Sequence, residues 1–149
     1  MFLSSATHTI DTKGRTSVPS PFRDFVGEDA AIYVWPSVHG PFLEGGGKPL
    51  METLQREILD RVSAGTLSPD AAEAQQMVLL GEARRLSYDQ TGRIVQPEAF
   101  SQHAGLSDAA TIFGQGNRFE IWEPGTHATR MDAMRDRAKA APRLFGVVR

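Results

Sequence analysis

Hydrophobic and polar positions along the chain follow two different periods, one in the middle and one on either side of it. Four apolar residues recur at every fourth position in the middle: Leu50, Leu54, Ile58 and Val62. This spacing places them on one face and predicts an amphipathic helix. Ser68-Pro69 supplies an N-cap and a first-turn proline for a second helix that runs toward Leu80 and ends at Gly81.

The outer parts of the chain contain short runs of β-branched and aromatic side chains that predict strands. These runs are residues 8–10, 16–18, 30–35, 110–113 and 119–122. Gly114-Gln115-Gly116-Asn117 separates the last two runs and predicts a hairpin between them.

A third helix is predicted near the end of the chain, from about His127 to Ala141. Met131, Met134 and Ala138 are expected to face inward. The basic residues are expected to face outward: Arg130, Arg135, Arg137 and Lys139.

One motif occurs twice without gaps. Asp11-x-x-Gly14-Arg15-x-x-x-Pro19-x-x-Phe22 returns 78 positions later as Asp89-x-x-Gly92-Arg93-x-x-x-Pro97-x-x-Phe100. Five identical residues at one constant offset indicate an internal duplication.

Each copy of the motif predicts a strand, a tight turn, a second strand and a short helix. Asp11 and Asp89 can accept hydrogen bonds from the backbone two residues ahead, and Gly14 and Gly92 supply the positive φ that the turn requires. We therefore interpret these four residues as supports of the turn. Pro19 has no N–H to donate, so it suits the end of a strand and the start of a helix.

The two motifs, together with the segment Gly116-Asn117-Arg118-Phe119-Glu120-Ile121-Trp122, resemble the MraZ family, a two-repeat branch of the AbrB-like (SpoVT-AbrB) swapped-hairpin transcription factors. The resemblance extends from Met1 into the last predicted helix. Three positions depart from the family's usual pattern. Ser4 stands in place of a glycine, Gln96 interrupts an apolar run, and His127 lies near a common tryptophan.

The resemblance implies an α+β, mainly β fold. Two AbrB-like halves would close into one pseudo-symmetric, β-barrel-like core, with helices between and after the halves. The expected segments are residues 1–48 for the first half, 49–81 for a helical connector, 82–126 for the second half, and 127–149 for a C-terminal helix and tail.

The resemblance also implies a function. A ring-shaped homo-oligomer would bind double-stranded DNA at direct repeats upstream of its own division and cell-wall gene cluster and repress that cluster. The basic loop of the Asp-x-x-Gly-Arg motif would contact the DNA.

Lys13 and Arg15 are the leading candidates for DNA contact. An arginine that projects from a turn can donate two hydrogen bonds to guanine, whereas a lysine neutralises a phosphate. The alternative is that Arg15 only pairs with Asp11 and holds the turn. Arg93 has the same two interpretations, because one copy of a duplication often keeps the site while the other keeps the fold.

Arg23, Arg84 and Arg85 are weaker candidates for phosphate contact, since a charged residue is usually a solvated one. Charge is unevenly distributed along the chain, whose net charge is −2. Lys/Arg minus Asp/Glu gives +1 for residues 1–27, −6 for residues 28–83 and +3 for residues 84–149. A chain of this kind binds DNA only if the acidic middle faces away from the duplex.

Composition and motif spacing argue against an enzyme, a cofactor and a metal site. The chain has no cysteine, and its histidines (His8, His39, His103 and His127) lack metal-ligand spacing. Gly45-Gly46-Gly47-Lys48 lacks the remaining residues of a phosphate loop, so a flexible loop is expected there. Aromatic residues of the strands (Trp35, Phe113, Phe119 and Trp122) are expected to pack in the core rather than stack on bases.

The N-terminus has no signal-peptide pattern, and no apolar run is long enough for a membrane helix. We therefore expect a chain that starts at Met1 and is cytoplasmic and nucleoid-associated, with no membrane and no small-molecule substrate. One alternative function stays open. An AbrB-like antitoxin-type module would use the helical middle or the C-terminal helix to hold a partner protein, and a toxin-like neighbouring gene would favour it.

Overall fold

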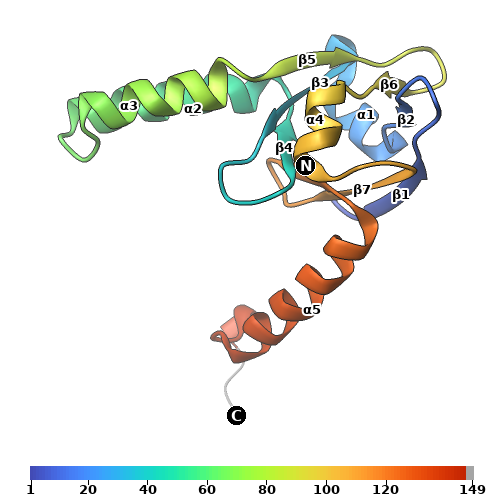
Figure 1. Ribbon diagram of the computed structural model, residues 1–149. Coiled ribbons are helices and arrows are strands. Elements are labelled where there is room, and N and C mark those ends of the chain that lie inside the picture. Colours follow the sequence, from blue (N-terminus) through green and yellow to red (C-terminus); the bar gives the residue numbers. More distant parts are fainter. Residues whose placement is uncertain (147–149) are drawn as a thin grey trace.

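The computed structural model describes residues 1–146, so the last three residues of the expected segment 127–149 lie outside the described part. The described residues form eight strands in two antiparallel sheets (Figure 1). The first copy of the repeat contributes β1 (Ser5–Thr9), β2 (Arg15–Ser17), β3 (Ala31–Pro36) and β4 (Leu43–Gly46). The second contributes β5 (Arg84–Ser87), β6 (Arg93–Val95), β7 (Ala109–Gly114) and β8 (Phe119–Trp122).

Strands of the two copies alternate in space rather than forming two separate sheets. The larger sheet has the order β1-β7-β8-β4-β3-β5, and the smaller one pairs β2 with β6. From one edge of the larger sheet the first three strands are β1, β7 and β8. From the other edge they are β5, β3 and β4, which are the corresponding strands of the opposite copy. The expected α+β class is confirmed. The larger sheet is open, with β1 and β5 at its edges, so closure into a barrel is not observed.

Short helices follow each turn, namely α1 (Ser20–Val26) with the 3₁₀ turn η1 (Gly27–Asp29), and α4 (Glu98–Ala104). Three segments form a helical arm between the copies: α2 (Lys48–Ser63), α3 (Pro69–Gln75) and the π-helical turn η2 (Gln76–Leu80). The predicted N-cap is confirmed, because the Ser68 hydroxyl accepts from the Ala71 amide at 3.1 Å. The chain ends in α5 (Pro124–Ala140) and the 3₁₀ turn η3 (Leu144–Gly146).

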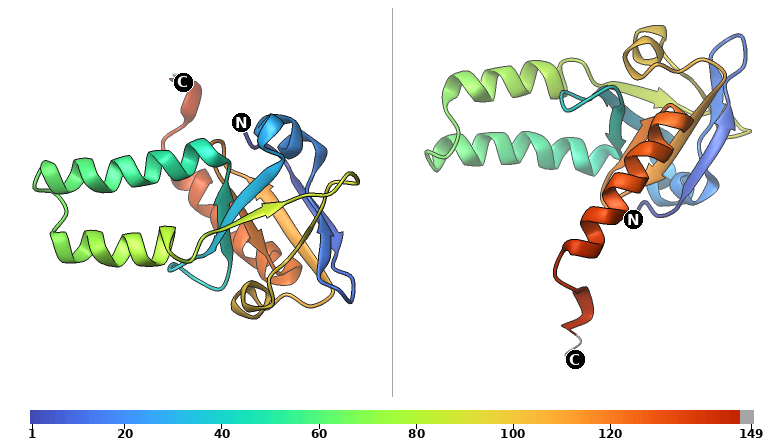
Figure 2. Two further views of the ribbon diagram at one scale, coloured as in Figure 1. Left: turned by 90° about the horizontal axis from the view of Figure 1, so that it is seen from above. Right: turned by 60° about the horizontal axis from the view of Figure 1, so that its bottom comes forward.

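The helical arm and α5 both leave the sheets, in different directions (Figures 1 and 2). The apolar stripe predicted for α2 packs mainly within the arm, where Ile58 is buried. α5 has no buried residue, because it extends beyond the sheet. Met131 and Met134 are partly buried as expected, but Ala138 is exposed, so its predicted inward position is wrong.

The core lies between the larger sheet, the β2–β6 pair and the helices α1 and α4. Phe2, Phe22 and Phe119 are fully buried and pack edge-to-face or tilted, with ring centroids 5.0 to 5.6 Å apart. Trp35 and Trp122 are also buried. The expected core packing of these strand aromatics is therefore confirmed, with Phe113 only partly buried.

The segment Gly45-Gly46-Gly47 is buried, so the flexible loop expected there is wrong. Gly45 and Gly46 belong to β4, and a Cβ atom at Gly45 would lie 2.6 Å from both the Phe119 ring and the Tyr33 carbonyl oxygen. Glycine stands here because a neighbouring strand and ring approach the backbone too closely for a side chain.

The three departures from the family pattern all occupy special environments. Ser4 has φ of 69°, a conformation that favours glycine. Gln96 is 4% exposed, and neither end of its amide has a hydrogen-bond partner within residues 1–146. The His127 ring lies 4.6 Å from that of Phe113, and burial lowers the pKa of His127. Within the same residues, no helix is both long and apolar enough to cross a membrane.

Candidate nucleic-acid interface

The small antiparallel sheet of β2 and β6 joins the two Gly-Arg turns to each other (Figure 1). Its opposed residues are Arg15 with Val95, Thr16 with Ile94, and Ser17 with Arg93. The pairing continues beyond the strands. The Val18 amide donates to the Gly92 carbonyl, and the Gln96 amide donates to the Gly14 carbonyl, both at 2.8 Å. The glycine of each turn therefore accepts a hydrogen bond from the residue that follows the second strand of the other copy.

Successive side chains of this sheet point alternately to the core and to solvent. Thr16 and Ile94 point to the core and are 7% and 2% exposed. The remaining four side chains share the outer face: Arg15, Ser17, Arg93 and Val95. Two arginines thus project from one surface. We call residues 11–17 and 89–95 the Gly-Arg ribbon.

The first turn is held by the carboxylate of Asp11. This side chain accepts hydrogen bonds from the backbone amides of Lys13 and Arg15, each at 2.9 Å. The backbone closes the same turn, since the Gly14 amide donates to the Asp11 carbonyl at 3.0 Å and Gly14 adopts φ of 81°. The Arg15 backbone amide, and next the Arg15 side chain, lower the pKa of Asp11.

The second turn repeats this arrangement around Asp89. Its carboxylate accepts from the backbone amides of Thr91 at 2.9 Å and Arg93 at 3.0 Å, and from the Thr91 hydroxyl at 2.7 Å. The Arg93 amide, and then the Thr91 hydroxyl, lower the pKa of Asp89 from 3.8 to about 2. Gly92 has the same φ of 81° as its counterpart.

Both arginines bind their own turn through Nε. Arg15 Nε lies 2.7 Å from Asp11 Oδ2. Arg93 Nε donates to the Thr91 hydroxyl at 3.0 Å and lies 3.6 Å from Asp89 Oδ2. Within residues 1–146 the terminal nitrogens of these two guanidinium groups make no hydrogen bond. Each side chain is 38% exposed, so the turn orients an arginine whose outer donors remain free.

Lys13 is exposed at the tip of the first turn, and its ammonium makes no hydrogen bond within the described residues. The duplication places Thr91 at the corresponding position of the second turn. The two turns therefore share one backbone design but differ by one cationic charge.

Arg23 is half-buried and lies against the second turn. Its Nε donates to the Val18 carbonyl at 3.1 Å. A Cβ atom at Gly92 would lie 2.6 Å from both Cζ and Nε of Arg23, so the guanidinium packs directly on that glycine. Arg23 of the first copy thereby braces the turn of the second copy.

Of the weaker candidates, Arg85 is engaged within the fold and Arg84 lies exposed on the same strand. Arg85 donates to the carbonyl of Asp29 at 2.7 Å and to its carboxylate at 3.1 Å. These two arginines lie on β5, at an edge of the larger sheet and outside the Gly-Arg ribbon. No cluster of three or more His, Cys, Asp or Glu side chains that could hold a metal occurs in the described part of the chain.

Ser17, Thr91 and Val95 take part in the Gly-Arg ribbon but were not singled out as site residues from the sequence. A signal was present for Ser17 and Val95, because alternation along a strand puts them on the same face as the arginines. No local pattern in the sequence indicated that β2 pairs with β6, because the two strands are almost 80 residues apart along the chain.

Comparison with known proteins identifies relatives along most of the chain. The sequence profile of a family described as "MraZ protein, putative antitoxin-like" matches residues 79–145. A protein of Beijerinckia indica is 35% identical over 142 residues, which cover 93% of this chain and 83% of the relative. One of Parvibaculum lavamentivorans is 39% identical over 132 residues, which cover 85% of this chain and 78% of the relative.

A protein of Azorhizobium caulinodans extends the match to 147 residues at 31% identity, covering 97% of this chain and 91% of the relative. All three relatives carry the name "Transcriptional regulator MraZ". The identity of more than 30% over nearly full length, together with the two turns built alike, shows that this chain belongs to the MraZ family.

Proposed function

We propose that the chain is a sequence-specific DNA-binding transcription regulator without catalytic activity, and that the Gly-Arg ribbon is its DNA-contacting surface. The observation that supports this most strongly is the pair of outward arginines with free terminal nitrogens on one two-stranded sheet. A two-stranded β-ribbon fits the width of the major groove and is an established way of reading it.

In this proposal Arg15 and Arg93 read base edges. A guanidinium fork can donate two hydrogen bonds to O6 and N7 of guanine, and each such pair contributes about 1–3 kcal/mol of discrimination. Asp11 and Asp89 support this role by fixing the direction of each fork through Nε. Gly14 and Gly92 support it by giving the backbone the turn conformation.

Lys13 and Arg23 would contact phosphates. Lys13 extends from the tip of the turn, where an ammonium can neutralise a phosphate without selecting a sequence. Arg23 uses only Nε within the described residues, so its terminal nitrogens can serve the same purpose beside the second turn.

Assembly completes the proposed function. One ribbon offers few contacts, whereas linked ribbons on tandem sites gain avidity of about 100-fold or more. We therefore propose a ring-shaped homo-oligomer, built of pseudo-symmetric units, that represses its own division and cell-wall genes from direct repeats. Such a regulator works in the cytoplasm, associated with the nucleoid.

A second candidate is an antitoxin-type module that binds a partner protein. The description of the matched family includes the words "putative antitoxin-like", and the helical arm exposes Leu59 and Met77 at 52% and 65%. A toxin-like gene beside this one, together with a complex of the two products, would favour this candidate over the first.

The test is a mobility-shift titration with DNA from upstream of the chain's own gene. Arg15→Ala should abolish the specific shift, because the variant loses a base-reading fork. Arg15→Lys should keep weak, sequence-independent binding, because it keeps the charge without the fork. Arg61→Ala is the matched control, since Arg61 is an exposed, ion-paired arginine on the helical arm. Unchanged specific binding by Arg15→Ala would refute the role given to this residue.

A further inference from the structure

One face of the helical arm combines acidic and apolar side chains that are exposed and that no other part of residues 1–146 covers. Asp70, Glu73 and Met77 follow each other at intervals of three and four residues, so they share a face of α3 and the start of η2. All three are exposed, Met77 at 65%. Neither acid forms an ion pair within residues 1–146. We call these three residues the acidic face.

The arm as a whole is acidic. Residues 48–80 contain three Lys/Arg and five Asp/Glu, a net charge of −2. At 1.5 Å per residue, the 16 residues of α2 carry its tip about 24 Å away from the start of the helix. An arm of this length with only Ile58 and Ala72 buried is a protruding element rather than part of the core.

A groove with the opposite character lies between α5 and the β7–β8 hairpin. Its volume is about 530 Å³. Three of its lining side chains are apolar, namely Phe113, Met131 and Met134. Arg130 and Arg137 stand one helical turn to either side of Met134 and make no ion pair within the described residues. We call this the α5 groove.

The other charged groups at the α5 groove are engaged with one another. Arg118 binds Glu44 at 2.6 Å and Glu120 at 3.4 Å. Glu120 also accepts from the indole nitrogen of Trp122 at 2.9 Å. The guanidinium groups in the groove that remain without an ion pair within the described residues are therefore those of Arg130 and Arg137. The helix α5, which carries both arginines, is itself basic, since residues 124–140 contain four Lys/Arg and two Asp/Glu.

We infer that the α5 groove is the docking site for the acidic face of a second copy of this chain. Apolar side chains would meet at the centre, with Met77 against Met131 and Met134, and the acids would meet the two arginines. A chain cannot fill its own groove, because its arm and α5 leave the sheets in different directions (Figures 1 and 2). The inference rests on the proposed homo-oligomer and names the surfaces that build it.

This contact is heterologous, since each copy offers an arm to one neighbour and a groove to the other. Heterologous contacts generate rings when the rotation closes and filaments when it does not. DNA is the competing occupant for basic α5. The groove is less suited to DNA, because its lining includes three apolar side chains and the carboxylate of Glu120, and because α5 extends from the opposite part of the molecule to β2 and β6 (Figure 1).

Charge reversal tests the contact by light scattering of the full chain. In the groove variant, Arg130→Glu with Arg137→Glu, an acidic groove meets the unchanged acidic face. The two surfaces repel each other, so the variant should have the mass of a monomer. In the arm variant, Asp70→Lys with Glu73→Lys, a basic arm meets the unchanged basic groove, so this variant should also have the mass of a monomer. An equimolar mixture of the two should recover the wild-type mass, because every reversed groove then finds a reversed arm.

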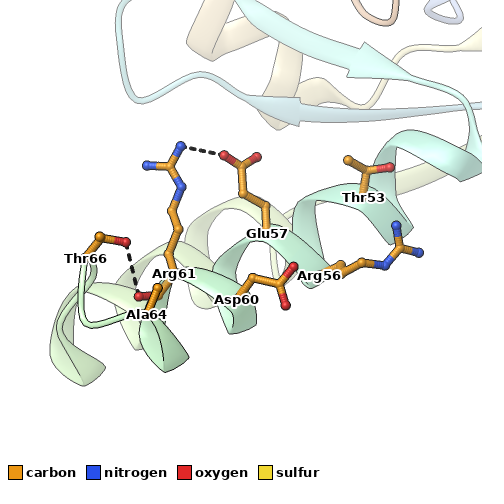
Figure 3. Close-up of a pocket in the computed structure, with 7 residues that line it drawn as sticks. All are labelled: Thr53, Arg56, Glu57, Asp60, Arg61, Ala64 and Thr66. Carbon is orange, nitrogen blue, oxygen red and sulfur yellow. Dashed lines mark hydrogen bonds and ion pairs between the residues drawn. The ribbon is translucent and has the colours of Figure 1, made fainter.

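The controls each reverse a single charge of the same kind outside the proposed contact. Arg135 lies outside the groove lining and pairs with Asp132 at 3.5 Å, so Arg135→Glu should keep the wild-type mass. On the arm, Glu57→Lys should keep it too, since Glu57 pairs with Arg61 at 2.6 Å on a mixed-charge face of α2 (Figure 3). Circular dichroism verifies that all four variants are folded.

Retention of the wild-type mass by both reversed variants, or no recovery in the mixture, overturns the inference but leaves the proposed DNA binding intact. The inference also fails if the groove variant keeps its mass but loses DNA binding, because α5 would then contact DNA. A monomeric wild-type protein would refute the assembly and the docking site together. DNA binding by the Gly-Arg ribbon would still be decided separately by Arg15→Ala.

Discussion

Arg15 and Arg93 show that an ion pair within a turn and a contact outside it are compatible. From the sequence, pairing of Arg15 with Asp11 was an alternative to DNA binding. In the structure the pair involves Nε alone, so the carboxylate aims the guanidinium while its outer edge remains free. An exposed ion pair of this kind adds little to stability. Its value lies in holding a long side chain in one direction before a ligand arrives.

The contact between Gly92 and Arg23 gives a prediction for stability. Gly92→Ala must place a side chain at positive φ, which costs about 1–2 kcal/mol, and must also displace the Arg23 guanidinium. Gly105→Ala carries only the first cost, because Gly105 has φ of 64° and nothing within 4 Å of a new Cβ. Urea unfolding should therefore show a larger loss for Gly92→Ala.

Arg23→Ala supplies the control for that comparison. In a chain that already lacks the guanidinium, Gly92→Ala should cost about as much as Gly105→Ala. An equal excess cost with and without Arg23 would mean that the arginine does not brace the second turn.

At the scale of elements, local signals predicted what depends on local sequence. The constant offset located both turns, the i+4 stripe predicted α2, and Ser68-Pro69 predicted the start of α3. The start of α5 was misplaced by three residues, because the cap is Glu123, whose carboxylate accepts from the amides of Gly125 and Thr126. Ala138 was misjudged because periodicity does not reveal where a helix leaves the surface that it packs on.

Local signals predicted the hairpin of β7 and β8, which the structure confirms, but they could not predict the pairing of strands between the two copies. β1 pairs with β7, β2 with β6 and β3 with β5, each pair being a long-range contact between the two copies. The outward side of the Gly-Arg ribbon follows from this pairing, so the sequence identified its arginines without showing that they share a face. The burial of Gly45 depends in the same way on Phe119 of a distant strand.

The two copies differ at one buried position that follows their second strands. Val18 of the first copy is 2% exposed, and its counterpart Gln96 is 4% exposed with an amide that has no partner within residues 1–146. A buried polar group left unsatisfied costs about 1–3 kcal/mol. Gln96→Val should therefore raise the free energy of unfolding in urea by about 1–2 kcal/mol. Val18→Gln should lower it, and a loss of stability in Gln96→Val would mean that the amide is satisfied after all.

For the whole molecule, a net charge of −2 means that DNA binding depends on where cations lie rather than on how many there are. The ribbon gathers Lys13, Arg15 and Arg93, while the acidic arm projects away from the sheets (Figure 2). Physiological salt screens exposed charges beyond about 8 Å, so the projection of the arm weakens the repulsion between its acids and DNA bound at the ribbon.

Salt dependence of binding measures this arrangement. Lys13→Ala should weaken binding to all sequences alike and reduce the slope of log affinity against log salt by about 1, because one phosphate contact is lost. Lys48→Ala is the control, since Lys48 is an exposed lysine at the base of the arm, and it should leave the slope unchanged. Equal slopes for Lys13→Ala and the wild type would exclude a phosphate contact by Lys13.

The union of both Gly-Arg turns in one polypeptide has an evolutionary consequence. In a symmetric dimer of identical chains, any substitution in the turn appears twice, and the two reading ends must stay the same. Here a single substitution alters one end only, as the exchange of Lys13 for Thr91 illustrates. The two ends of the ribbon are therefore chemically different, so in its proposed DNA-contacting role the ribbon would select for target sites that all point the same way.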